Sequence, residues 1–178
     1  AVVVAHHNTY DGHPDAYPMH ILSKILSDGQ SARIYRRLVY DQQVAVSAFG
    51  AGPIIEDPNL FYAVAVVQPG QSTETAAEAL IAELDRAKAE PPTDQEIQRA
   101  KNQFARDYVI GRISNSDKAS HLAHAHVIHD DITTADGELD IFLNVSKADV
   151  QRVAQTYLRD DNRLVMTILP RGSGAGRR

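Results

Sequence analysis

The chain has 178 residues, a formal net charge of −5 at pH 7 and no cysteine. The length is typical of one domain with a sizeable core, and the lack of cysteine excludes disulfides, thiol nucleophiles and thiolate metal sites. The mildly acidic balance gives no support for a nucleic-acid or membrane-surface partner, and no apolar run approaches the roughly 20 residues of a membrane span.

We therefore expect a single domain over residues 1–170 and a disordered Gly/Ser/Arg-rich tail over residues 171–178. Because the chain opens on a strand-like run without a starting Met, we expect it to be a piece of a longer protein. The compartment is left open between the bacterial periplasm and cytoplasm.

A short β-branched run at residues 1–5 predicts the first strand, and a loop rich in turn formers leads into two short helices over residues 15–41. Asp15 is placed to cap the first helix and Ser31 the second, with Gly29 between them in the left-handed conformation that ends a helix. Each helix has an apolar face. Its positions are Leu22, Ile25 and Leu26 in the first, and Ile34, Leu38 and Val39 in the second.

Two strand-like runs at residues 44–51 and 59–67 predict an antiparallel hairpin with a wide loop. Capping-box sequences that begin at Thr93 and Ser146 predict two helix starts. Strands and helices are partly segregated along the chain, which is typical of an α+β fold. We expect a two-layer sandwich, in which helices cover one face of a small, mainly antiparallel sheet. The remaining elements are helices over residues 72–90, 93–111, 117–129, 134–143 and 146–158, and a last strand over residues 163–169.

The helix expected over residues 117–129 carries four of the eight histidines. Pairs three residues apart, such as His121–His124 and His126–His129, could chelate a metal ion in principle. At about 100° per residue, however, His126 points well away from the first pair, and no Glu lies within either pair to act as a base. We predict surface or half-buried histidines and no metal ligand. On the same helix, the apolar residues expected to face the core are Leu122, Ala123 and Val127.

A basic patch formed by Arg33, Arg36 and Arg37 lies on the second helix. It is either a solvated helix face or a docking site for carboxylates of a substrate peptide or partner domain. The sequence has no G-x-S-x-G element, no Walker pattern and no G-x-G-x-x-G loop. The residues alone therefore define no self-contained catalytic site.

Three segments resemble signatures of the insulinase-like (pitrilysin-type) zinc metallopeptidase family. The L-S-D-G-Q-S-A-R-I-Y-R-R-L-V run at residues 26–39 is similar to the version found in the C-terminal half of those enzymes. The T-D-Q-E-I-Q-R-A-K-N-Q run at residues 93–103 and the V-S-K-A-D-V-Q-R-V-A run at residues 145–154 follow in the family's order. The resemblance covers nearly all of residues 1–169.

This resemblance implies an enzyme built from two homologous halves that close around a peptide. One half carries an H-x-x-E-H motif, in which two His bind zinc and Glu activates water. This sequence contains no H-x-x-E-H, so the resemblance implies the metal-free half, with zinc in the partner half and no metal or catalytic residue here. Some members hold the substrate carbonyl with a Tyr and an Arg from this half, and Val46 and Val39 stand near those positions.

We therefore expect a non-catalytic half that encloses and positions a peptide against a zinc-bearing partner half. The isolated chain is expected neither to cleave peptides nor to retain stoichiometric zinc. Two alternatives stay open: a structural scaffold subunit without associated peptidase activity, and a stand-alone metal protein that uses the helix from His121 to His129.

Overall fold

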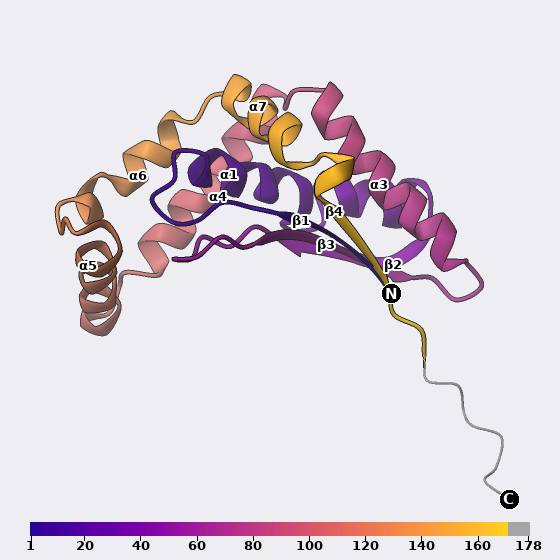
Figure 1. Cartoon of the computed structure of the whole chain (residues 1–178), viewed down its shortest axis with the longest axis horizontal. Coiled ribbons are helices and arrows are strands. Elements are labelled where there is room, and N and C mark those ends of the chain that lie inside the picture. Colours follow the sequence, from indigo (N-terminus) through magenta and orange to yellow (C-terminus); the bar gives the residue numbers. More distant parts are fainter. Residues whose placement is uncertain (171–178) are drawn as a thin grey trace, which may run out of the picture.

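The computed structural model describes residues 1–170, so the disorder predicted for residues 171–178 lies outside the described part (Figure 1). The predicted strands and helices form in the predicted order. The second helix is a single α-turn that continues as a π-helical turn, and a short 3-10 turn precedes the last strand. The elements are β1 (Val2–His7), α1 (Ala16–Ser27), α2 (Arg33–Tyr35), η1 (Arg36–Asp41), β2 (Ala45–Ala51), β3 (Leu60–Val67), α3 (Thr73–Ala89), α4 (Asp94–Ile110), α5 (Asn115–His129), α6 (Thr134–Asn144), α7 (Lys147–Tyr157), η2 (Asp160–Asn162) and β4 (Arg163–Thr167).

The sheet is antiparallel throughout, with strand order β2-β3-β1-β4. The chain reaches β3 directly from β2, which confirms the predicted hairpin. β1 and β4 lie side by side although they come from opposite ends of the sequence. Helices α1 and α3 pack against one face of this sheet, and α4 and α7 pack onto α1 (Figure 1). The α+β, two-layer architecture is therefore confirmed.

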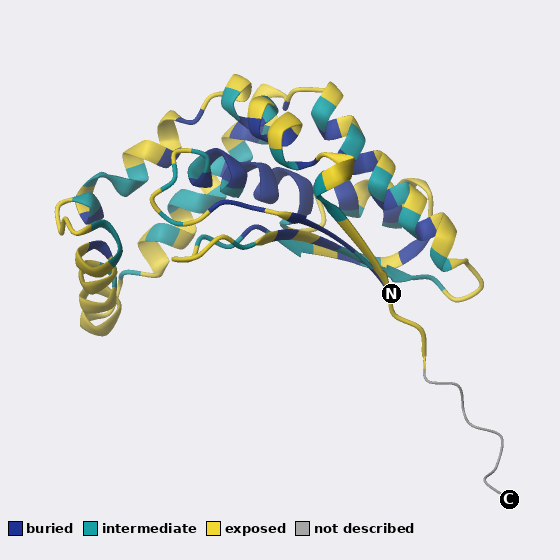
Figure 2. Cartoon of the chain, viewed as in Figure 1, coloured by how far each residue is buried: buried dark blue, intermediate teal, exposed yellow. Residues whose placement is uncertain are grey.

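Helix α1 is the centre of the core. It lies between the sheet and the outer helices, so nearly its whole circumference is buried (Figure 2). Even Lys24 is buried, and its ammonium group lies 3.1 Å from Asp28 Oδ2 and 3.0 Å from Asp107 Oδ2, which links α1 to α4. The apolar residues that α1 buries are Ala16, Pro18, Met19, Ile21, Leu22, Ile25 and Leu26.

The helix starts agree with the sequence where the capping partners are three residues apart. Complete capping boxes form at Thr93–Glu96 and Ser146–Asp149, as predicted, and a third forms at Ser114–Asp117. Asp15 occupies the N-cap position of α1, as predicted, but its side chain makes no capping hydrogen bond. The cap predicted at Ser31 was wrong.

Asp15 and Ser31 both have partners in distant segments of the chain. Asp15 accepts hydrogen bonds from Arg152 (2.7 Å) and Tyr157 (3.0 Å) of α7, so its carboxylate is not free to cap α1. The position before α2 is occupied by Ala32, and the Ser31 carbonyl accepts a hydrogen bond from Arg99 (2.8 Å). Gly29 has φ +82°, as expected for the residue that turns the chain after α1.

The orientation predicted for α5 was also wrong. Leu122 and Val127 are 42% and 73% exposed, Ala123 is exposed, and Ala125 is the buried residue. Four-residue steps from Ala125 lead to half-buried His121 and His129. The stripe that faces the protein is therefore one of histidine and alanine. In the part of the chain that the structure describes, no helix combines the length and apolar character that crossing a bilayer requires.

Candidate functional site

Arg33, the first residue of the predicted basic patch, is committed to an internal ion pair. Its Nε and Nη2 donate to the two carboxylate oxygens of Glu96 at 2.6 and 2.8 Å. The two side chains are only 10% and 20% exposed. These hydrogen bonds lower the pKa of Glu96 to about 2. Arg33 therefore joins the α2 turn to the start of α4, where Glu96 also completes the Thr93 capping box.

Arg36 and Arg37 are exposed and line a cavity of about 640 Å³ together with Arg33. Arg86 and Arg99 add two more guanidinium groups to its wall, against the acidic groups Asp41 and Glu96. Several arginines around one cavity favour the binding of a carboxylate or another oxyanion, because guanidinium groups form paired, charge-assisted hydrogen bonds. The residues that line the cavity are Ser31, Arg33, Arg36, Arg37, Asp41, Arg86, Thr93, Gln95, Glu96 and Arg99.

The second surface is the face of the sheet that α1 and α3 leave uncovered (Figure 1). The register places Phe49, Val64, Val3 and Met166 in one row across all four strands. The next row consists of Ala51, Tyr62, Ala5 and Leu164. All eight side chains are apolar or aromatic.

Solvent reaches much of this open sheet face. Phe49 and Tyr62 are 48% and 37% exposed, and Leu164 and Met166 are 58% and 50% exposed. A row of exposed apolar side chains on a rigid sheet is a surface that other apolar groups can cover.

Val46 and Val39, which the resemblance sets near the positions of a carbonyl-binding Tyr and Arg, both carry apolar side chains. Val46 is 49% exposed at the start of β2, and Val39 is half-buried in the π-helical turn. Neither side chain can donate a hydrogen bond, so neither can hold a substrate carbonyl.

The histidines of α5 have separate surroundings. His121 Nε2 lies 3.1 Å from the Ala135 carbonyl oxygen, and its Nδ1 lies 2.8 Å from Arg112 Nη2. His126 is exposed. His124 and His129 both approach Asp11, a contact between distant segments that the three-residue spacings did not indicate.

Sequence reasoning also missed a buried histidine in β1. His6 is 1% exposed and lies on the helix-covered side of the sheet beside Phe61. Burial lowers the pKa of His6 to about 4. The strand predicted at residues 1–5 ends too early, because β1 continues through His6 to His7. The β-branched run before His6 is the signal that could have found it.

Taken together, the fold and these surfaces define a class: a two-layer α+β domain with one open sheet face and no H-x-x-E-H motif. Residues 2–104 match the family of the peptidase M16 inactive domain. The chain belongs to this family, which confirms the resemblance to insulinase-like zinc metallopeptidases.

Individual relatives agree with this assignment. The chain is 25% identical over 158 residues to zinc protease PqqE of Helicobacter pylori, covering 89% of this chain and 35% of that protein. The inactive peptidase domain of a protein assigned as a zinc protease in Bordetella parapertussis has the same fold. It superposes with a TM-score of 0.85 at 24% identity over 98% of this chain and 94% of that one.

A protease structure from Helicobacter pylori gives a TM-score of 0.82 at 24% identity, over 92% of this chain and 40% of that one. The chain therefore spans little more than a third of the length of the curated relative that it matches.

Proposed function

We propose that this domain is the non-catalytic wall of a zinc peptidase, and that its open sheet face encloses a peptide against a zinc-bearing partner half. The observation that carries the proposal is the pair of apolar rows on that face, in a chain of the inactive-domain family. The family relation supplies the zinc chemistry, which belongs to the partner half. This chain contributes the open sheet face that contacts the peptide.

The physical role of such a wall is to position the peptide and to exclude water. Hydrolysis at a bound metal ion requires the scissile bond to be held in a fixed orientation. Enclosure also removes bulk solvent, which strengthens the electrostatic interactions that act on the reacting groups. Tyr62, Leu164 and Met166 offer apolar contact area to the side chains of an extended peptide, and the antiparallel sheet holds them at fixed spacing.

The arginine cavity is the contact that we propose for a carboxylate of the partner half or of the peptide. Arg36 and Arg37 are the residues proposed for this contact, because both line the cavity and are exposed. Arg37 Nη1 also lies 3.9 Å from Asp41 Oδ2, so Arg36 is the freer of the two. Arg33 serves a structural purpose instead, since Glu96 occupies its guanidinium group.

The experiment is a kinetic comparison of variants in the parent peptidase. Met166→Asp and Leu164→Asp place a charge on the open sheet face, and each is expected to lower kcat/KM by at least about tenfold, which corresponds to about 1.4 kcal/mol. The matched control is Val109→Asp, because Val109 is 61% exposed on α4 in the helical layer. Its kcat/KM is expected to stay unchanged.

Two further measurements complete the comparison. Zinc content and thermal midpoint are recorded for every variant, so that an effect on folding is separated from one on substrate. The double variant Arg36→Glu, Arg37→Glu is expected to reduce activity more at low salt than at high salt. Unchanged kcat/KM in both sheet variants would refute the proposed enclosure.

A structural scaffold is the second candidate function. Its basis is the same fold in a chain of Complex III2 from Candida albicans, with a TM-score of 0.75 at 13% identity over 92% of this chain and 41% of that one. The discriminating observation is the rest of the parent protein and its neighbouring genes. A scaffold requires that neither encodes an H-x-x-E-H half, whereas the peptidase requires that one of them does.

A further inference from the structure

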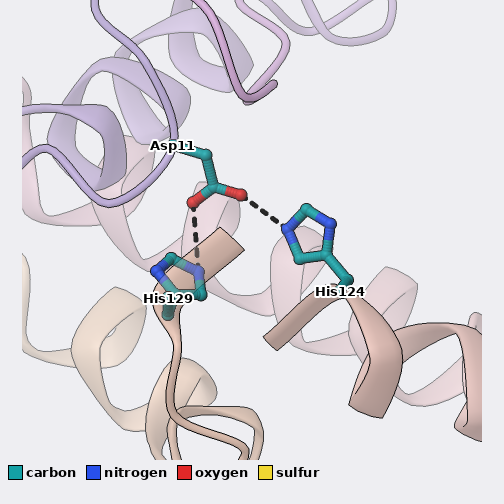
Figure 3. A group of neighbouring side chains, drawn as sticks. All are labelled: Asp11, His124 and His129. Atoms are coloured by element: carbon teal, nitrogen blue, oxygen red, sulfur yellow. Dashed lines mark hydrogen bonds and ion pairs between the residues drawn. The ribbon is translucent and has the colours of Figure 1, made fainter. Parts of the chain in front are cut away.

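Three potential metal ligands from two distant segments converge at one end of the molecule. Asp11 lies in the loop after β1, and His124 and His129 lie in α5 (Figure 3). His124 Nε2 is 2.6 Å from Asp11 Oδ2, and His129 Nε2 is 3.4 Å from Asp11 Oδ1. The three candidate ligand atoms all lie within 4.8 Å of one another.

We propose that Asp11, His124 and His129 form a structural zinc site that fastens α5 to the loop after β1. Two imidazole nitrogens and one carboxylate oxygen are a common ligand set for Zn²⁺, completed by water in the fourth position. This site is separate from the catalytic zinc expected in the partner half. It also revises the expectation from the sequence that the chain holds no metal.

The distances fit such an ion after a small adjustment. With metal–ligand bonds of about 2.0–2.1 Å, the ligand atoms of a tetrahedral site lie roughly 3.3 Å apart. His129 Nε2 lies 3.4 Å from Asp11 Oδ1, close to this value, while His124 Nε2 has to withdraw from Oδ2 by less than about 1 Å. His124 is free to do so, because its side chain is 45% exposed. The ligand atoms of the two histidines lie within 4.8 Å of each other, so the ion would also draw the two rings together.

The surroundings of Asp11 hold the ligands in place. The Asp11 side chain is only 7% exposed, and its backbone N–H donates to the Ile55 carbonyl oxygen at 2.8 Å. The next residue, Gly12, has φ +86°, and a Cβ there would lie 3.4 Å from His129 Nδ1. The positive φ favours glycine at this turn, and the His129 ring lies in van der Waals range of the loop.

A cavity of about 110 Å³ adjoins the two histidines, with His121, Glu138 and Tyr17 among the residues that line it. This volume exceeds the roughly 10–15 Å³ that one water needs. The space beside His124 and His129 is therefore large enough for a water ligand.

The proposed zinc site would stabilise the packing of α5 against the rest of the domain. Within α5, which the structure describes throughout, Ala125 alone is buried, so the helix contributes very little apolar surface to the core. A helix with so few buried contacts opens at low free-energy cost. An ion bound by the folded arrangement alone would stabilise it by mass action.

Helix geometry also explains why the sequence did not indicate that His124 and His129 share a partner. Residues five apart do not share a helix face, because they differ by about 140°. The two histidines nevertheless lie on either side of Ala125, the buried residue of α5, so both side chains reach Asp11 in the loop against which the helix packs.

The test is zinc binding by the purified chain after treatment with a chelator. We expect saturable binding of one equivalent and an upward shift of the thermal midpoint. His124→Ala and His129→Ala are each expected to weaken the binding by at least about 100-fold, since even the loss of a residue that hydrogen-bonds a metal ligand costs 10–100-fold. The matched control is His126→Ala, on the same helix and exposed, which should bind as the wild type does.

Co²⁺ in place of Zn²⁺ supplies a readout that is independent of folding stability. An intense visible absorption band, lost in both ligand variants and kept in His126→Ala, reports tetrahedral ligation by these side chains. The isosteric variant Asp11→Asn covers the case in which a truncated histidine disturbs α5. Failure of the wild-type chain to bind one equivalent would overturn the proposal, as would equal binding by the variants.

Discussion

At the scale of single residues, the clustered Arg33, Arg36 and Arg37 differ in burial and in their hydrogen-bond partners. Arg33 is nearly buried and pairs with Glu96 through two short hydrogen bonds. Arg36 and Arg37 remain exposed at the cavity rim. The difference follows from Glu96, which stands 63 positions later in the sequence and reaches only Arg33.

We expect Arg33→Ala to lower the free energy of unfolding by about 2–3 kcal/mol, because it leaves the Glu96 carboxylate half-buried without its cationic partner. Denaturant unfolding measures this loss. Arg36→Ala is the matched control, and its effect should stay within about 0.5 kcal/mol, as for most surface substitutions. Equal losses in the two variants would contradict the assignment of Arg33.

The same ion pair makes the stability depend on pH. Because the pKa of Glu96 falls from its ordinary value of 4.5 to about 2 on folding, its contribution is complete above pH 4.5. It is lost progressively as the pH falls toward 2. Arg33→Ala should therefore flatten the decline of the unfolding free energy over this window, and parallel curves for the two proteins would count against the interpretation.

Local pairs were predictable at this scale, and distant ones were not. The capping boxes at Thr93 and Ser146 were correct because both partners lie three residues apart, where helix geometry alone brings them together. Asp15 occupies the N-cap position of α1, but its carboxylate accepts a hydrogen bond from Arg152 of α7 and makes no capping hydrogen bond. A local sequence pattern does not predict a hydrogen-bond partner such as Arg152, which lies 137 positions away.

At the scale of elements, the packing of α1 against the β2–β3 hairpin depends on Gly50. A Cβ at this position would overlap the carbonyl oxygen of Tyr62 on the neighbouring strand. It would also lie 3.0 Å from the Ala63 Cα and 3.1 Å from the Ser27 Cβ. Two of these neighbours are backbone atoms of β3, so relief requires the strands to move.

We expect Gly50→Ala to destabilise the fold by about 3 kcal/mol through this overlap. Gly137→Ala is a control of opposite sign, because Gly137 lies inside α6 with no atom within 4 Å of an added Cβ. There the substitution should stabilise by roughly 0.5–1 kcal/mol through helix propensity. Thermal or denaturant unfolding separates the two, and a neutral Gly50→Ala would contradict the close packing.

The contrast between α1 and α5 explains which elements the sequence could orient. Helix α1 is buried on nearly every side, so any apolar stripe predicted on it faces a neighbour. Helix α5 lies at the end of the molecule and is mostly exposed (Figure 2). It packs through Ala125 and the half-buried His121 and His129. Its apolar Leu122 and Val127 instead face solvent, and apolar periodicity therefore gave the wrong side.

At the scale of the whole molecule, the helical layer leaves one face of the sheet open, and the rows around Phe49 and Tyr62 cover that face with apolar groups. The family resemblance could be recognised from three runs of sequence. The open face could not, because its rows combine strands from both ends of the chain through the β1–β4 pairing. The proposed enclosure of a peptide follows from that face.

The most direct test is reconstitution of peptidase activity from this chain and a separately purified zinc-bearing half of the parent protein. We predict that neither chain cleaves peptides alone, whatever zinc is supplied, and that the mixture hydrolyses them at a rate that saturates with the concentration of this chain. Full activity of the zinc-bearing half alone would contradict the account, as would zinc-dependent turnover by this chain alone.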